Sequence, residues 1–119
     1  MLNSSMKKKY SLPTIILFVY NREDHLRKTI TSLKKNKNYR KFNIIIFGDG
    51  PKNKIDEQKI NKVKLYVKNI QGFNNKKFFF NIKNQGLAKS VVNGINKVFK
   101  IRNVDSIIVL EDDLNLNKN

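Results

Sequence analysis

Four short runs of apolar, mostly β-branched residues recur along this chain of 119 residues, and segments with helical spacing separate them. The runs are Thr14–Tyr20, Asn43–Phe47, Phe78–Ile82 and Ser106–Leu110. Each run is continuous rather than alternating, which is typical of strands that are covered on both faces. We therefore predict four buried strands.

The segments between the runs carry apolar residues at the spacing of one helix face. In chain order these residues are Leu26, Ile30 and Leu33, then Ile60, Val63, Val67 and Ile70 after a start near Asp56, and then Leu87, Val91, Ile95 and Val98. Strand–helix–strand repetition of this kind predicts an α/β fold, with a mostly parallel sheet flanked by helices. A ligand would bind beyond the carboxyl ends of the strands, where the strand order reverses. With the order 3-2-1-4, that point lies between the first and fourth strands.

Composition excludes several kinds of site. The chain has no cysteine, which excludes disulfides, thiolate zinc sites and a cysteine nucleophile. His25 is its only histidine, so a site with several imidazoles is excluded as well. The net charge of +16 attracts polyanions, but lysine supplies most of it, and we interpret most of these lysines as solvated surface residues.

Polar residues follow each predicted strand. Glu111, Asp112 and Asp113 come directly after the fourth run, and their mutual repulsion would be relieved by a divalent cation such as Mg²⁺ or Mn²⁺. A metal held there would bridge a diphosphate and stabilise it as a leaving group. The alternative is a solvated acidic turn, but its place after a fourth parallel strand favours the metal.

The other strand ends allow two interpretations each. Asp49 lies in a Gly-Asp-Gly-Pro turn, where it either serves the turn itself or accepts a hydrogen bond from a nucleotide base. Arg22, after Asn21, lies at a helix start, where a positive charge is unfavourable, so it is either an exposed side chain without a partner or a ligand of a phosphate. Asn84 belongs either to a tight turn before a helix or to a sugar-binding segment.

The order of these segments resembles the nucleotide-sugar glycosyltransferases of the GT-A fold. The resemblance rests on Pro13–Arg22, Asn43–Asp49, Asn84–Ser90 and Ile107–Leu114, and it covers about residues 12–116. The Glu-Asp-Asp-Leu sequence looks closest to the N-acetylglucosaminyltransferase-I-like branch, with family 2 transferases as near relatives. The resemblance implies a Rossmann-like nucleotide-binding half of the GT-A fold.

The resemblance also implies roles for individual residues. Asp49 matches the residue that reads uracil, and Arg22 matches an arginine near the donor diphosphate. Glu111 and Asp112 match acidic positions near the ribose and the sugar, and Asp113 matches the carboxylate that holds Mn²⁺, with Asp112 beside it. Asn21 and Asn84 complete the expected nucleotide-sugar site.

In the GT-A-fold glycosyltransferases that this chain resembles, the acceptor-binding half and the catalytic base follow the metal motif. We therefore expect the base beyond Asn119 and a domain, residues 12–119, that is truncated after the metal motif and lacks the acceptor half. Residues 1–11 are expected to form a flexible basic leader. Apolar surface should be exposed beside the fourth strand.

The implied activity is transfer of a sugar from a nucleotide donor, with UDP favoured, to a glycan or lipid-linked acceptor in bacterial surface polysaccharide synthesis, with Mn²⁺ or Mg²⁺ as cofactor. The expected location is cytoplasmic, with peripheral contact of the basic surface with the anionic inner membrane face. The alternatives are a basic nucleic-acid-binding module and an inactive fragment of a transferase. Nucleic acid is disfavoured because no nucleic-acid-binding motif is found. A sugar nucleotidyltransferase is disfavoured because the segment after the first strand lacks glycine.

Overall fold

A computed structural model of the chain describes residues 14–100 and 107–111. These residues form the strands β1 (Thr14–Val19), β2 (Asn43–Gly48), β3 (Asn75–Phe80) and β4 (Ile107–Glu111) and the helices α2 (Glu23–Lys34), α3 (Lys54–Asn69) and α4 (Leu87–Phe99), with a short 3-10 helix at Tyr39–Lys41. The predicted leader, residues 1–11, lies outside the described residues. Among the described helices, none has the length and apolar character needed to cross a bilayer.

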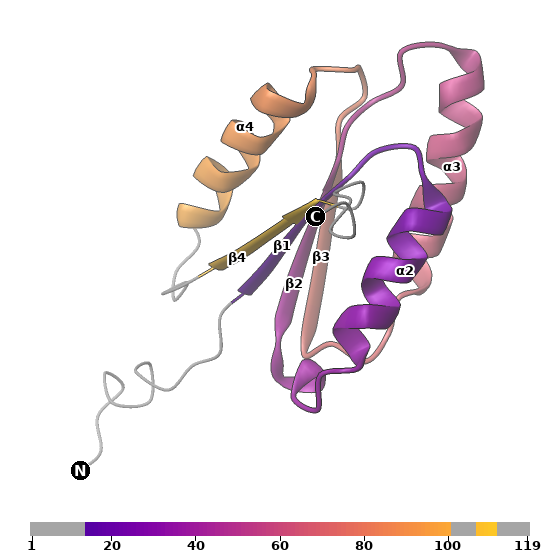
Figure 1. Cartoon of the computed structure of the whole chain (residues 1–119). Helices are drawn as coiled ribbons and strands as arrows, with labels where there is room; N and C mark the ends of the chain where they lie inside the picture. The colour runs from indigo at the N-terminus through magenta and orange to yellow at the C-terminus, as the bar shows by residue number, and fades with distance from the viewer. Residues whose placement is uncertain (1–13, 101–106, 112–119) are drawn as a thin grey trace, which may run out of the picture.

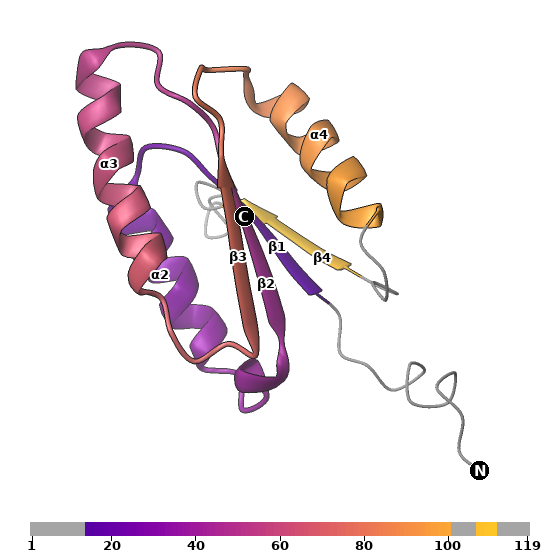
Figure 2. The same ribbon diagram turned by 180° about the vertical axis from the view of Figure 1, so that it is seen from behind.

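The four strands form one parallel sheet in the order β3-β2-β1-β4, as predicted. Helices α2 and α3 cover one face, and α4 lies on the other (Figures 1 and 2). The strand order reverses between β1 and β4, since β2 lies on one side of β1 and β4 on the other. The carboxyl ends of these strands are therefore the place to look for a site.

The two central strands carry the core. All six residues of β1 are buried, and β2 is buried from Ile44 onward. Ile15 and Leu17 pack with buried residues of α2 and α3, whereas Ile16 and Phe18 face α4 and Val98. The prediction of strands covered on both faces is thus confirmed for β1 and β2.

Three aromatic rings form a ladder across the α4 face of the sheet. Phe18, Phe47 and Phe79 are register partners on β1, β2 and β3. The ring centroids of Phe18 and Phe47 are 5.5 Å apart, as are those of Phe47 and Phe79. A Cβ atom on Gly94 would lie 2.9 Å from the Phe18 ring, so this glycine allows α4 to pack closely on the ladder.

The outer strands differ from the prediction. β3 begins earlier than the predicted run 78–82 and also ends earlier, at Phe80. Ile82 lies beyond the strand and is 90% exposed. Phe78 is 37% exposed, because β3 has only β2 beside it within the described sheet. On β4, Ile108 and Val109 are exposed, so burial of the fourth run is wrong, whereas apolar surface beside this strand was expected.

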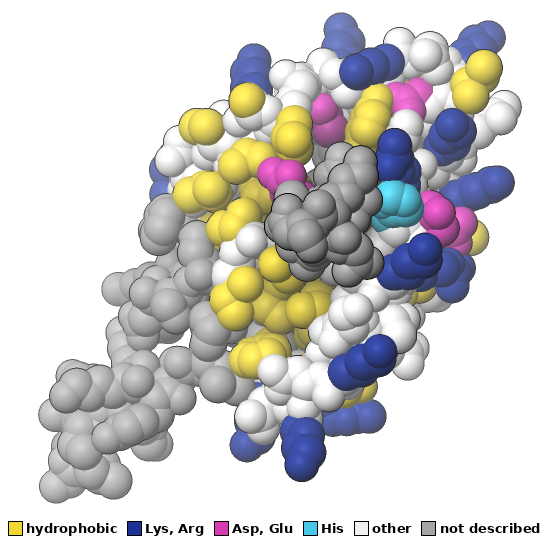
Figure 3. Space-filling model, in the orientation of Figure 1, with side chains coloured by type: hydrophobic (Ala, Val, Ile, Leu, Met, Phe, Trp, Pro, Cys, Tyr) yellow, Lys and Arg dark blue, Asp and Glu magenta, His cyan; other side chains and the backbone are white. Residues whose placement is uncertain are grey.

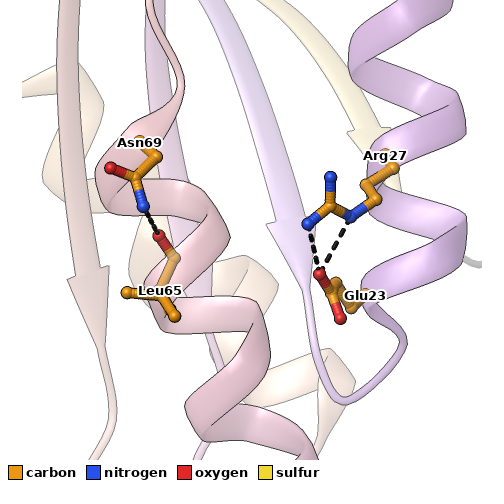
Figure 4. A network of polar contacts seen from close by, with 4 residues as sticks. All are labelled: Glu23, Arg27, Leu65 and Asn69. Carbon is orange, nitrogen blue, oxygen red and sulfur yellow. Dashed lines mark hydrogen bonds and ion pairs between the residues drawn. The ribbon is translucent and has the colours of Figure 1, made fainter.

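Surface residues of α2 and α3 make contacts within each helix and between the two helices. Within α2, Arg27 forms an ion pair with Glu23 one turn earlier, at 2.6 Å, and within α3 Asn69 donates to the carbonyl of Leu65 (Figure 4). The Arg27 guanidinium also lies 4.4 Å from the centre of the Tyr66 ring on α3. Lysine and arginine side chains are scattered over the face seen in Figure 3 rather than gathered in one patch.

Candidate functional site

A pocket of about 150 Å³ opens at the carboxyl ends of β1 and β2, beside the start of α4. Its wall combines apolar and aromatic side chains with a few polar groups: Phe18, Val19, Tyr20, Phe47, Asp49, Lys52, Asn84, Gly86, Leu87 and Ser90. Residues of β1 and β2 form one part of this wall, and the segments that follow β1, β2 and β3, together with the start of α4, form the rest. Such a pocket suits a flat, partly apolar group that also needs hydrogen bonds.

The Asp49 carboxylate lies in this wall and is only 7% exposed. Its Oδ1 accepts hydrogen bonds from the N–H groups of Gly50 (2.8 Å) and Gln85 (2.9 Å) and from the Asn81 amide (3.0 Å). Its Oδ2 accepts one from the N–H of Gly86 at 3.0 Å. Asp49 therefore fastens the loop after β3 to the end of β2, beyond the local turn role that the sequence suggested.

These contacts keep Asp49 ionised. Burial by itself would raise its pKa, but the hydrogen bonds from Asn81, Gln85, Gly50 and Gly86 outweigh burial and hold the pKa below its ordinary value. A carboxylate oxygen can accept more than one hydrogen bond. Oδ2 accepts only one from the described residues, so it retains capacity for a donor in the pocket.

The segment from Asn84 to Leu87 forms the opposite wall. Asn84 donates through its amide to the carbonyl of Gly50, at 2.9 Å, which joins the two loops a second time. Gly86 starts α4 with φ of 86°, a conformation that favours glycine. Leu87, counted on the apolar face of the third predicted helix, is 53% exposed, because the first residue of α4 lies at the pocket.

Asn21 and Arg22 do not lie in this pocket. Asn21 donates through its amide to Asp56 on α3, at 2.7 Å. Arg22 is exposed at the N-cap of α2 and lines a separate surface hollow with Lys59 and Lys62. Arg22 therefore lies outside the pocket that Asp49 lines, beyond the end of the neighbouring strand β1.

Only the first residue of the acidic triplet is described. Glu111 ends β4, is half-buried, and is the register partner of Phe18. Asp112 and Asp113 lie outside the described residues. Within residues 14–100 and 107–111, no three side chains of the metal-binding types come together.

The family model for glycosyl transferase family 2 matches residues 14–119. The chain belongs to glycosyl transferase family 2. Membership supports sugar transfer from a nucleotide-sugar donor, and the parallel sheet in the order 3-2-1-4 agrees with the expected GT-A fold. The match is to the family that the sequence analysis named as a near relative. Comparisons with curated proteins and with solved structures gave no match.

Sequence reasoning missed several residues at the pocket of this glycosyltransferase. Tyr20, Lys52 and Ser90 line it, and Asp56 and Asn81 hold its loops. Tyr20 was counted only as the end of a strand, and Asp56 only as an acidic residue near a helix start. For Tyr20 the position directly after a predicted strand, at the expected ligand-binding edge, was the available signal, because that edge gathers side chains from neighbouring loops.

Proposed function

We propose that residues 12–119 form the nucleotide-sugar-binding domain of this glycosyltransferase, and that the pocket beside Asp49 binds the base of a nucleoside diphosphate donor. One observation carries the proposal: a buried, ionised carboxylate lies in a mainly apolar and aromatic pocket at the carboxyl ends of β1 and β2. Aromatic and aliphatic side chains suit the faces of a base, and the carboxylate suits a polar N–H on its edge.

The charge of Asp49 favours a base that donates a hydrogen bond. An ionised carboxylate only accepts hydrogen bonds, so its partner must be a donor. Uracil, thymine and guanine carry a ring N–H at the edge that faces away from the sugar, whereas neutral cytosine has an unprotonated ring nitrogen there and donates only through its 4-amino group. UDP is the donor nucleotide that we propose, since the resemblance also assigns uracil to Asp49.

For the metal, we propose Asp113 as the direct ligand with Asp112 beside it, and Glu111 and Asp112 near the ribose and sugar. Glu111 lies on the strand next to β1, on the side where the strand order reverses, which supports a diphosphate position there. Mn²⁺ or Mg²⁺, when bound, would supply the positive charge that stabilises the departing nucleoside diphosphate. Arg22 is proposed to approach the diphosphate from the next strand end.

The proposed acceptor is a glycan or a lipid-linked sugar in bacterial surface polysaccharide synthesis. A cytoplasmic location with contact to the anionic face of the membrane fits the excess of 25 Lys+Arg over 9 Asp+Glu. The finer assignment to the N-acetylglucosaminyltransferase-I-like branch rests on the sequence Glu-Asp-Asp-Leu at positions 111–114.

The proposal is tested by calorimetric titration of the full chain with UDP, dTDP, GDP and CDP, each with MnCl₂ and with EDTA. UDP with Mn²⁺ should bind most tightly and CDP most weakly. Leu87→Ala should weaken UDP binding about fivefold, because it removes roughly 1 kcal/mol of apolar contact with the ligand. Leu65→Ala on α3 is the matched control, since Leu65 is 63% exposed and lies away from the pocket.

Equal loss of UDP affinity in the two leucine variants would refute the assignment of this pocket to donor binding. Equal affinity for UDP and CDP would remove the proposed role of Asp49 in reading the base. Binding that is indifferent to EDTA would overturn the metal assignment while leaving the base pocket in place.

A further inference from the structure

A second buried carboxylate, that of Asp56, lies next to the nucleotide pocket in the first turn of α3 and is 7% exposed. Its Oδ2 accepts hydrogen bonds from the Tyr20 hydroxyl and from the backbone N–H of Lys52, the latter at 2.9 Å. Its Oδ1 accepts one from the Asn21 amide at 2.7 Å. Because residues 20–21 follow β1 and Lys52 follows β2, Asp56 joins the ends of the two central strands.

The helix itself does not need this carboxylate. Asn53 is the N-cap of α3, and its side chain accepts a hydrogen bond from the Asp56 N–H at 2.8 Å. Burying a charge is unfavourable unless it is hydrogen-bonded, so a charged residue at position 56 requires the donors that surround it. We therefore relate the Asp56 charge to the donors that it holds, on the segment after β1 and on the turn after β2.

Two of these partners form part of the pocket wall, whereas Asp56 does not. Tyr20 and Lys52 both line the pocket. The Tyr20 hydroxyl has one hydrogen, and it is directed at Asp56, so this side chain is held both at the sheet and at α3. The turn that carries Lys52 is held through its backbone.

The charge states agree with this arrangement. Burial alone would raise the pKa of Asp56, but the hydrogen bonds from Tyr20, Lys52 and Asn21 lower it below its ordinary value. Burial, followed by the hydrogen bond to Asp56, raises the pKa of Tyr20, and the Asp49 charge adds to this. At neutral pH the pair is therefore a phenol donating to a carboxylate, the stronger kind of hydrogen bond.

We propose that Asp56 is a positioning residue of the nucleotide pocket, which fixes the Tyr20 ring and the Lys52 turn in the wall that contacts the donor. The inference rests on the proposed function, because the positions of the walls matter only if the pocket binds a nucleotide. A wall side chain that is already ordered loses less conformational entropy when the ligand binds. Removing the Asp56 contacts therefore weakens nucleotide binding while every pocket residue keeps its contact atoms.

The test is the affinity of the full chain for UDP in the presence of MnCl₂, measured by calorimetry well below the unfolding midpoint of each variant. Tyr20→Phe keeps the ring and removes only the hydroxyl, and we expect it to bind UDP about tenfold more weakly. Tyr66→Phe is the matched control, because Tyr66 lies on α3 beside Arg27, away from the pocket. Its affinity should equal that of the unmodified chain.

A double-mutant cycle separates positioning from a general loss of stability. Asp56→Asn should also weaken UDP binding about tenfold, and Tyr20→Phe combined with Asp56→Asn should be little worse than Asp56→Asn alone, since Tyr20→Phe removes one of the contacts that Asp56→Asn already weakens. Additive losses would overturn the proposal, because they would mean that the two residues act separately. If Asp56→Asn does not fold, the comparison of Tyr20→Phe with Tyr66→Phe decides.

The outcomes distinguish this proposal from the proposed function. If the unmodified chain binds UDP and the Tyr20 and Asp56 variants bind it equally well, the positioning role is refuted and the proposed nucleotide pocket stands. Failure of the unmodified chain to bind any of the four nucleoside diphosphates would refute both.

Discussion

Replacing Lys76 by methionine should destabilise the fold through the end of a helix, not through the strand on which this lysine lies. The Lys76 ammonium on β3 donates hydrogen bonds to the carbonyl oxygens of Val67 at 2.8 Å and of Lys68 and Ile70 at 2.9 Å. Carbonyls at the C-terminal end of a helix lack intrahelical donors, and a cation there interacts favourably with the helix dipole. Methionine keeps the apolar stem and removes all three donors.

The magnitude follows from these contacts. A hydrogen bond in which one partner is charged contributes about 1.5 kcal/mol or more, but water replaces part of that where the carbonyls are accessible. Burial lowers the pKa of Lys76, which means that holding the ammonium there also costs free energy. Allowing for both, we expect the free energy of unfolding to fall by about 2 kcal/mol, which corresponds to roughly 8 °C in the unfolding midpoint.

The assay is urea unfolding followed by far-ultraviolet circular dichroism, since the chain has no tryptophan. Lys77→Met is the matched control: Lys77 is the next residue of β3, is exposed, and points to the other face of the sheet. It should change the unfolding free energy by less than about 0.5 kcal/mol. Equal urea midpoints for the two variants would refute the assignment of Lys76 as the group that caps the C-terminal end of α3.

Two further perturbations test the loops around the pocket. Asp49 and Asp56 have folded-state pKa values below the ordinary 3.8, so their contribution to stability is complete above about pH 5 and is lost as pH falls through the folded-state values. Asp49→Asn should therefore flatten the dependence of the unfolding free energy on pH below this range, and an unchanged slope would contradict the role of its hydrogen bonds. Gly50→Ala would place a Cβ atom 2.4 Å from the backbone carbonyl carbon of Lys83, so we expect more than about 2 kcal/mol of destabilisation together with loss of UDP binding. A wild-type midpoint in urea would show instead that the loop after β3 adjusts at no cost.

The sequence was sufficient for the alternation of parallel strands and helices and for the central strands, because both depend on local patterns, whereas the order 3-2-1-4 is an expectation that the pattern alone does not decide. The apolar runs of β1 and β2 lie between helical segments, and that alternation leaves few topologies. β3 was misplaced by about three residues at its start, because its first half, Asn75–Lys77, is polar and pairs only with β2. An edge strand needs no apolar residue on an uncovered face, so its sequence carries a weaker pattern.

The site was predicted only where a residue has a local signature. Asp49 could be found because it lies between glycines after a strand. Asp56 could not, because its partner Tyr20 is 36 positions away and nothing near it in the sequence indicates a contact. Arg22 was assigned to the donor diphosphate from its place after β1, and this role stays a prediction, since Arg22 is exposed at the N-cap of α2 and lies outside the pocket beside Asp49.

The ladder formed by Phe18, Phe47 and Phe79 has a consequence for how the chain finds its fold. Ile44–Ile46 are three identical residues, so sliding β2 by two positions along β1 would keep each isoleucine on its own face of the sheet. The rings do not tolerate this, since such a slide would move one ring about 7 Å along its neighbour and break both stacked pairs. The three phenylalanines thus select one strand alignment among several that the isoleucines alone would accept.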